Sequence, residues 1–108
     1  MKLSEAIIEG SKLKPQAFCA DITGTRSCAL QAAGEALGWD RKGSNFCTPW
    51  ELLEDKYPYI LDVVVNPVTG DAYSLENIIY RLNDTNRWTR EDIAAWVATK
   101  EGELCPSL

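Results

Sequence analysis

The chain contains four cysteines and no histidine among its 108 residues, so the thiols are the first side chains to consider for chemistry. Four thiolates can hold a tetrahedral zinc ion, but structural zinc sites usually use pairs of ligands about two to four residues apart. Here the gaps between successive cysteines hold eight, eighteen and fifty-seven residues. This spacing favours small buried thiols. We therefore predict free thiols and no cofactor. One alternative is a disulfide, and the other is a metal site formed by Cys19, Cys28 and Cys47.

Cys28 is the best-placed thiol for covalent chemistry, because a cysteine at a helix N-terminus has a lowered pKa. Its usual catalytic partner, histidine, is absent from the chain. Paired carboxylates could perform acid–base catalysis only where their surroundings separate their pKa values, and the sequence reveals no such pair. We therefore predict no catalytic residues and place an enzyme last among the function classes.

The clearest helical pattern runs from Ser74 to Glu101, where two amphipathic helices flank a polar corner at 83–86. Ser74 and Thr89 are the expected N-caps, because their hydroxyls can accept hydrogen bonds from the free amides of a first turn. The corner has the outline of a DNA-binding helix-turn-helix, in which the second helix enters the major groove. We favour an ordinary corner within a helical core.

The charges of the second of these helices argue against nucleic acid. Its expected exposed face carries Glu91, Asp92 and Glu101, so phosphates would repel much of it. The bases expected on that face are Arg90 and Lys100. The whole chain has a net charge of −5 and no run of basic residues. Such a protein is a poor candidate for binding nucleic acid or an anionic membrane.

Three more helices are predicted in the first half of the chain, over residues 4–14, 28–37 and 49–57. The helix over 28–37 is rich in alanine, and small side chains let a neighbouring helix approach closely. We therefore place it at the centre of the fold, with the two helices of the 74–101 segment packed against it. The expected N-caps of the three helices are Ser4, Ser27 and Thr48.

Residues 59–72 allow two interpretations. The stretch ILDVVV at 60–65 is rich in β-branched residues, and NPVTGD at 66–71 is a turn, so together they could form a hairpin. A single hairpin is only marginally stable in isolation. Because the rest of the chain is helical, we favour a short helix from Pro58 to about Val64.

Length and composition predict one globular domain, since 45% of the residues are hydrophobic and 25% are charged. The expected fold is mainly α: a compact bundle of four to five short helices over residues 1–103. A small β-hairpin near 60–72 is an option, and a frayed tail follows over 104–108. The chain shows no signal peptide and no apolar run approaching about 20 residues, so we expect a cytoplasmic protein.

Four tryptophans and four tyrosines are many for a domain of this size. If some of them are exposed, they would form an apolar patch of the kind that marks a protein-binding site. The alternative is that all of them pack together in the core. The candidate partner-binding residues are Trp39, Trp50, Tyr57, Tyr59 and Trp88.

Three stretches resemble a family of small uncharacterised proteins encoded in phage, prophage and bacterial genomes. They are MKLSEAI…LKPQ at Met1–Gln16, SCALQAAGEALG at Ser27–Gly38 and LND…WTRE.IA.WV at Leu82–Val97, and they cover about half of the chain. Members of that family often carry a Cys-Pro-x-x-Cys-like metal knuckle before the penultimate helix. This chain has VVVNPVTGD at Val63–Asp71 instead, without cysteine. The resemblance implies a fold and a genomic setting, but no activity.

These observations together predict a non-enzymatic protein-interaction module, encoded by a phage or prophage, with a protein partner and no membrane. A homodimer is one form that the partnership could take. The alternative function is a small metal- or nucleic-acid-associated regulatory domain, which would use the four cysteines or the helical corner at 74–101.

Overall fold

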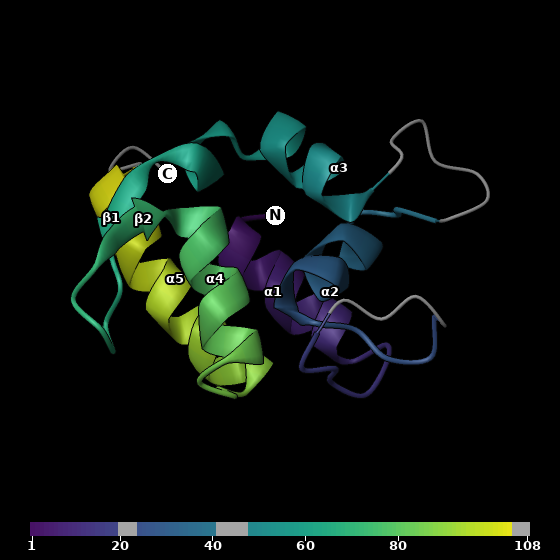
Figure 1. Cartoon of the computed structure of the whole chain (residues 1–108). Coiled ribbons are helices and arrows are strands. Elements are labelled where there is room, and N and C mark those ends of the chain that lie inside the picture. Colours follow the sequence, from purple (N-terminus) through teal and green to yellow (C-terminus); the bar gives the residue numbers. More distant parts are fainter. Residues whose placement is uncertain (20–23, 41–47, 105–108) are drawn as a thin grey trace.

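The computed structural model describes residues 1–19, 24–40 and 48–104, and it confirms the predicted mainly helical fold with a small hairpin (Figure 1). None of the described helices is both long and apolar enough to cross a membrane. Cys47 lies outside the described residues, and so does the tail predicted over 104–108 except Leu104, which belongs to the last helix. The elements in chain order are α1 (Leu3–Ser11), α2 (Ala29–Ala36), α3 (Pro49–Lys56), η1 (Pro58–Leu61, a 3-10 helix), β1 (Val63–Val65), β2 (Ala72–Ser74), α4 (Leu75–Asp84) and α5 (Arg90–Leu104).

Helices α1 and α2 form the centre of the helical packing. Helix α2 packs against α1, α3 and α4, and α1 packs against α2 and α5. The expectation that α2 is central is confirmed for α4, but it is corrected for α5, which packs chiefly against α1. Gly10 sets how closely α1 and α2 approach, because a side-chain carbon there would lie 1.8 Å from the carbonyl oxygen of Ala32. Glycine thus lets α1 cross α2 almost backbone to backbone, and the expected close packing around the small residues of α2 is confirmed.

Three of the predicted helix starts have the expected caps. The hydroxyl of Ser74 accepts a hydrogen bond from the amide of Asn77 at 3.2 Å, and that of Thr89 accepts from Asp92 at 3.1 Å. Thr48 caps α3 in the same way. These caps were predictable because the donor and the acceptor lie three residues apart in the chain.

The start of α1 differs from the prediction, because a side chain from near the other end of the sequence binds there. Helix α1 begins at Leu3, so Ser4 is not its cap. The carboxylate of Glu101 accepts hydrogen bonds from the amides of Leu3 and Ser4 at 2.9 and 3.4 Å. The Tyr59 hydroxyl donates to the same carboxylate. Glu101 was expected on an exposed face of α5, but it is only 2% exposed because it caps α1.

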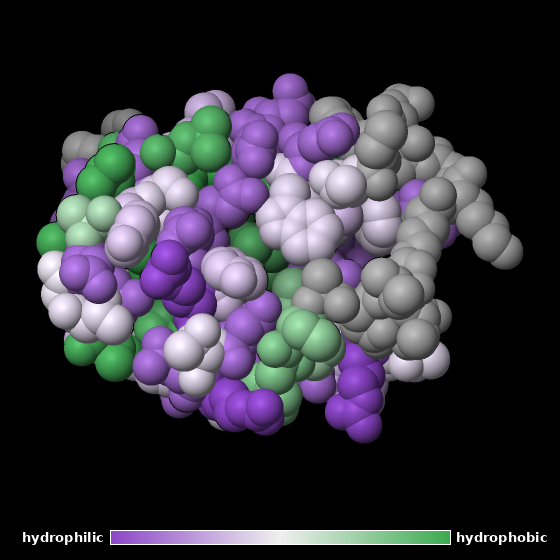
Figure 2. All heavy atoms as spheres, viewed as in Figure 1, coloured by the Kyte–Doolittle hydropathy of each residue, from purple (hydrophilic) through white to green (hydrophobic). Residues whose placement is uncertain are grey.

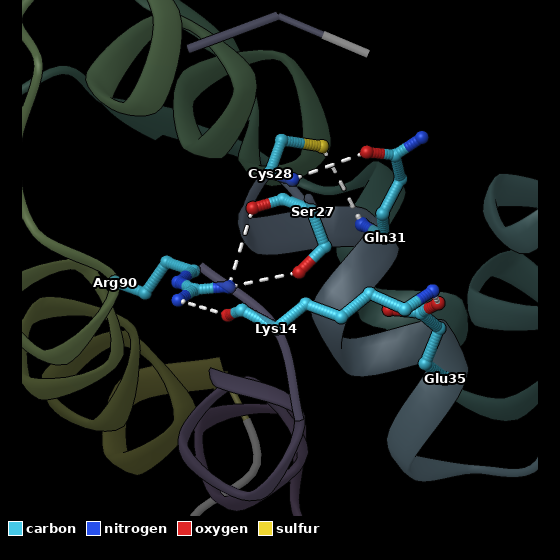
Figure 3. Close-up of polar contacts among 6 residues, drawn as sticks. All are labelled: Lys14, Ser27, Cys28, Gln31, Glu35 and Arg90. Atoms are coloured by element: carbon cyan, nitrogen blue, oxygen red, sulfur yellow. Dashed lines mark hydrogen bonds and ion pairs between the residues drawn. The ribbon is translucent and has the colours of Figure 1, made fainter. Parts of the chain in front are cut away.

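Arg90 is the second residue of α5 that was wrongly expected on an exposed face, and it is 5% exposed. Its Nη1 donates to the carbonyl oxygen and the hydroxyl of Ser27 at 3.2 and 2.8 Å (Figure 3). Its Nη2 donates to the carbonyls of Ser11 and Lys14 at 3.2 and 2.8 Å. Arg90 therefore joins the start of α5 to the end of α1, while Glu101 joins the other two ends. The two helices are consequently antiparallel.

A buried asparagine holds α4 against the chain around α2. The polar residues at 83–86 were expected to stop the helix at 83, but α4 continues through Asp84. Asn83 is fully buried, and its Oδ1 accepts from the amide of Ala29 at 3.1 Å. Its Nδ2 donates to the carbonyl of Ala17 at 2.8 Å. These long-range bonds satisfy a polar side chain that burial would otherwise penalise.

Residues 58–74 combine both of the structures that the sequence allowed. The expected helix is present as η1 but ends at Leu61, and β1 and β2 then pair antiparallel, with Val64 opposite Tyr73. The turn explains why the valines form a strand. The Oδ1 of Asn66 accepts from the amides of Val68 and Thr69 at 2.8 and 3.2 Å, which reverses the chain. Strand β2 then runs directly into α4.

Candidate functional site

An apolar groove is lined by residues of α1 and α5, with one residue from the end of α2. Its volume is about 720 Å³. It forms because α5 presents alanines there, and a methyl group is too short to fill the space beside the longer side chains of α1. The apolar residues that line it are Met1, Ile8, Leu13, Ala36 from the end of α2, Ala94, Ala95 and Ala98.

Two large apolar side chains of the groove are exposed. Met1 is 65% exposed and Leu13 is 60% exposed, although both are large hydrophobic side chains. Ile8, between them, is half-buried and packs against the core. The groove is therefore open to solvent along α1, and a bound partner would remove this apolar surface from water.

Carboxylates border the groove on both helices. Glu5 and Glu9 are one helical turn apart on α1, Glu91 stands on the first turn of α5, and all three are exposed. Among the described residues that line the groove, no side chain is basic. Glu9 does form an ion pair with the neighbouring Lys12 at 3.0 Å, but these side chains are 50% and 63% exposed. Such exposed pairs are weak and exchangeable, so the rim favours positive charge.

A second apolar surface covers the hairpin end of the molecule. Figure 2 shows hydrophobic residues gathered over the end that carries η1 and the hairpin. Val63 is 68% exposed and Val65 is 54% exposed, and both lie on the outer face of β1. The other large hydrophobic residues exposed in this segment are Leu61, Val68 and Tyr73.

The five aromatic residues proposed from the sequence do not line the groove among its described residues. Trp39 is half-buried, and Trp50, Tyr59 and Trp88 are half-buried against the core. Tyr57 is 6% exposed, and its hydroxyl donates to the carbonyl of Met1 at 2.8 Å. Its ring lies 6.0 Å from that of Tyr59, so these two are the pair that the fold brings together. A partner-binding role for the five stays a prediction.

Cys28 is the N-cap of α2, a position that the sequence had suggested for Ser27. Its Sγ accepts a hydrogen bond from the amide of Gln31 at 3.5 Å, and the Gln31 side chain accepts from the amide of Cys28 (Figure 3). Burial raises the pKa of the Cys28 thiol to about 11, against the lowering effect of the helix N-terminus. A thiol with this pKa is protonated at neutral pH and is a poor nucleophile.

The remaining cysteines give no metal geometry to describe. Cys19 is exposed and Cys28 is buried, whereas Cys47 lies outside the described ranges. The described part of the chain contains no group of three or more residues that could hold a metal ion. The alternative set of Cys19, Cys28 and Cys47 is therefore untested.

A pair of glutamates between α3 and α4 was not apparent from the sequence. Burial and the hydrogen-bonded Glu54 carboxyl raise the pKa of Glu76 to about 7. Glu76 also lines a hollow of about 200 Å³, beside Trp50 and Tyr80. Because the two glutamates belong to separate helices, only a knowledge of the helix packing could have paired them.

Comparison with known proteins finds no match among family models, curated proteins or solved structures. The resemblance of the three stretches to phage and prophage proteins therefore remains a prediction.

Proposed function

We propose that this protein is a non-enzymatic protein-interaction module and that the groove between α1 and α5 binds its partner. The observation that carries the proposal is a concave apolar surface of about 720 Å³ with exposed residues at both ends. Exposed apolar patches mark interaction sites, because burying them against a partner releases the water that covers them.

The contacts that join α1 to α5 support a binding role. Glu101 and Arg90 join α1 to α5 at both ends, and both side chains are almost fully buried. The two walls of the groove are thus held in a fixed relation before any partner arrives. Such preorganisation lowers the entropy cost of binding.

The chemistry of the described side chains also supports binding over catalysis. The groove lining contains carboxylates, a serine and apolar groups. Ser4 is 7% exposed, and no histidine exists in the chain to activate it. We further propose a partner inside a bacterial cell, from the phage or from its host, on the strength of the family resemblance.

Site-specific photo-crosslinking in bacterial cells tests this proposal. A photo-reactive amino acid at Ala98, in the groove, is compared with the same group at Thr99, which is exposed on α5 but does not line the groove. We expect a discrete adduct with one protein from position 98 alone. The proposal is wrong if neither Ala98 nor Ala95 gives an adduct, or if position 99 gives the same one.

The captured protein must then be tested in purified form. We expect it to bind the unmodified chain, and we expect Ala98→Trp to weaken that binding at least tenfold by filling the groove. Thr99→Trp is the matched control and should leave the affinity within about twofold. Equal effects of the two tryptophans would place the partner elsewhere on the surface.

A further inference from the structure

We infer that the occupant of the groove is a basic amphipathic helix of a partner protein. The inference rests on the proposed function, since it names the chemistry of the partner for the same surface. It follows from three properties of the groove: its direction, the backbone that borders it, and the charge of its rim.

The direction of the groove suits an elongated ligand. Contacts at opposite ends, from Glu101 to Leu3 and from Arg90 to Lys14, make α1 and α5 antiparallel neighbours. A groove between two such helices follows both axes. Its lining begins at Met1, just before α1, and ends at Leu13, just after it, and the nine residues of α1 between them correspond to about 13 Å at the helical rise per residue. A partner helix of about nine residues or more covers that length.

The backbone along the groove favours a helix over an extended peptide. Both walls are helices, whose interior amides and carbonyls are already bonded within each helix, and the described residues that line the groove include no strand edge. An extended peptide would lay most of its amides and carbonyls on the apolar floor, where only the few carboxylates at the rim could accept, and this is costly. A helix satisfies its own backbone and presents only side chains.

The alanines set how deeply such a helix can lie. Ala94, Ala95 and Ala98 line the groove from α5, and their short side chains let a partner approach the backbone of α5 closely. Apolar side chains of the partner, spaced three and four residues apart, can then contact the groove while Ile8 and Leu13 flank them. This arrangement would complete a three-helix face.

The rim determines the charge of the partner. Glu5, Glu9 and Glu91 border the groove from both sides, and none of its described lining residues has a basic side chain. Lysine or arginine beside the apolar stripe of a bound helix would lie near these carboxylates. The ion pair of Glu9 with Lys12 is exposed on both sides, so a partner cation can replace Lys12.

A displayed library of fifteen-residue amphipathic helices, randomised at the apolar and flanking positions, tests the inference with the full chain. Sequences that also bind the Ala98→Trp variant are discarded, which leaves binders of the groove. We expect these binders to carry an excess of lysine and arginine at the flanking positions. We also expect their affinity to fall as salt increases, because screening weakens exposed charge interactions.

Neutralising the carboxylates at the rim then separates their local effect on binding from the effect of the net charge of the whole chain. For a selected peptide, the triple change Glu5→Gln, Glu9→Gln and Glu91→Gln should weaken binding about tenfold. The matched control, Asp55→Asn, Asp62→Asn and Asp71→Asn, removes the same charge from exposed positions outside the groove and should change the affinity less than twofold.

The outcomes distinguish this inference from the function on which it depends. Groove binders with neutral or acidic flanks would overturn the basic helix while leaving the groove as the binding site. An equal effect of the two triple variants would also overturn it. If every selected peptide still binds the Ala98→Trp variant, both the inference and the proposed groove are wrong.

Discussion

The groove and the hairpin both expose apolar side chains to solvent, but for different structural reasons. The outer valines of β1 have a structural reason for being there, because β-branched side chains favour the extended backbone even where they are solvated. The alanines of α5 favour the helix, and the amide of Leu13 donates to the carbonyl of Gly10 at 3.0 Å where α1 ends, but neither role requires the Leu13 side chain to be exposed. The groove is also concave and bordered by carboxylates, whereas Val63 and Val65 stand outward from a strand.

The two regions also differ in how they are held. The groove lies on helices that Gly10 brings close to α2 and that Arg90 and Glu101 join at both ends. The hairpin has two strands of three residues each, and the Arg81 guanidinium lies 4.6 Å from the centre of the Tyr73 ring. Exposed apolar area alone therefore does not identify a binding site. Shape, charge at the rim and a rigid support discriminate between these two surfaces.

The largest expected effect comes from Gly10→Ala. This substitution tests whether the close packing of α1 on α2 holds the groove in place. The new side-chain carbon would meet the Ala32 backbone, so we expect the free energy of unfolding to fall by about 3 kcal/mol or more. Urea denaturation measures this change. Gly102→Ala is the matched control, because nothing lies within 4 Å of a side-chain carbon there. It should stabilise α5 by about 0.5–1 kcal/mol through helix propensity.

A Gly10→Ala variant with unchanged stability would mean that α1 does not cross α2 as closely as the structure has it. The contrast with the hairpin would then lose its main physical basis.

Glu101→Gln tests the contact that joins the start of α1 to α5. An amide in place of the carboxylate weakens the hydrogen bonds with the Leu3 and Ser4 amides and with Tyr59, so we expect a loss of about 2 kcal/mol in the free energy of unfolding. Amide exchange of α1 should accelerate, while exchange of the hairpin should not. Glu103→Gln, exposed and paired with Lys100, should cost less than about 0.5 kcal/mol. Equal losses from the two substitutions would contradict the capping role of Glu101.

The pH dependence of stability should come from the hairpin side of the molecule, where Glu76 begins α4. The pKa of Glu76 in the folded protein is raised from 4.5 to about 7, so the folded state binds a proton that the unfolded state has lost. The free energy of unfolding should therefore fall as the pH rises through this interval. Because Glu76 is half-exposed, solvent screening reduces the effect to about 1 kcal/mol.

Thermal unfolding across this pH interval measures the slope, and Glu76→Gln should flatten it. Asp55→Asn, on the exposed side of α3, is the control and should leave the slope in place. A slope that persists in Glu76→Gln would assign the titration to another group.

The smallest effect is expected for Val65→Thr on the outer face of β1. Threonine keeps the branched shape, and the valine is already 54% exposed, so stability should change by less than about 0.5 kcal/mol. Binding of a groove-selected peptide should not change. A large loss of partner binding in this variant, measured beside Ala98→Trp, would reverse the comparison and make the hairpin the binding surface.

Much of the fold could be predicted because the signals are local. The hydroxyls of Ser74, Thr89 and Thr48 cap helices through amides three residues away, so the sequence carries both partners of each bond. The hairpin was harder to predict, because Pro58 indicates the start of a helix whereas the valines of β1 and the turn at Asn66 indicate a hairpin. The structure contains both elements, with η1 followed directly in the chain by the hairpin.

What the sequence by itself determined about this protein is the set of helices, the caps at Thr48, Ser74 and Thr89, and the acidic character of the chain. Which faces those helices bury was decided by the tertiary structure. The sequence suggests that Arg90 and Glu101 are surface charges on α5, yet both are buried because their partners belong to segments more than forty residues away in the chain. The groove likewise exists only because α1 and α5 meet side by side. Local hydrogen bonding is encoded within a few residues, whereas a binding surface depends on contacts between distant ones.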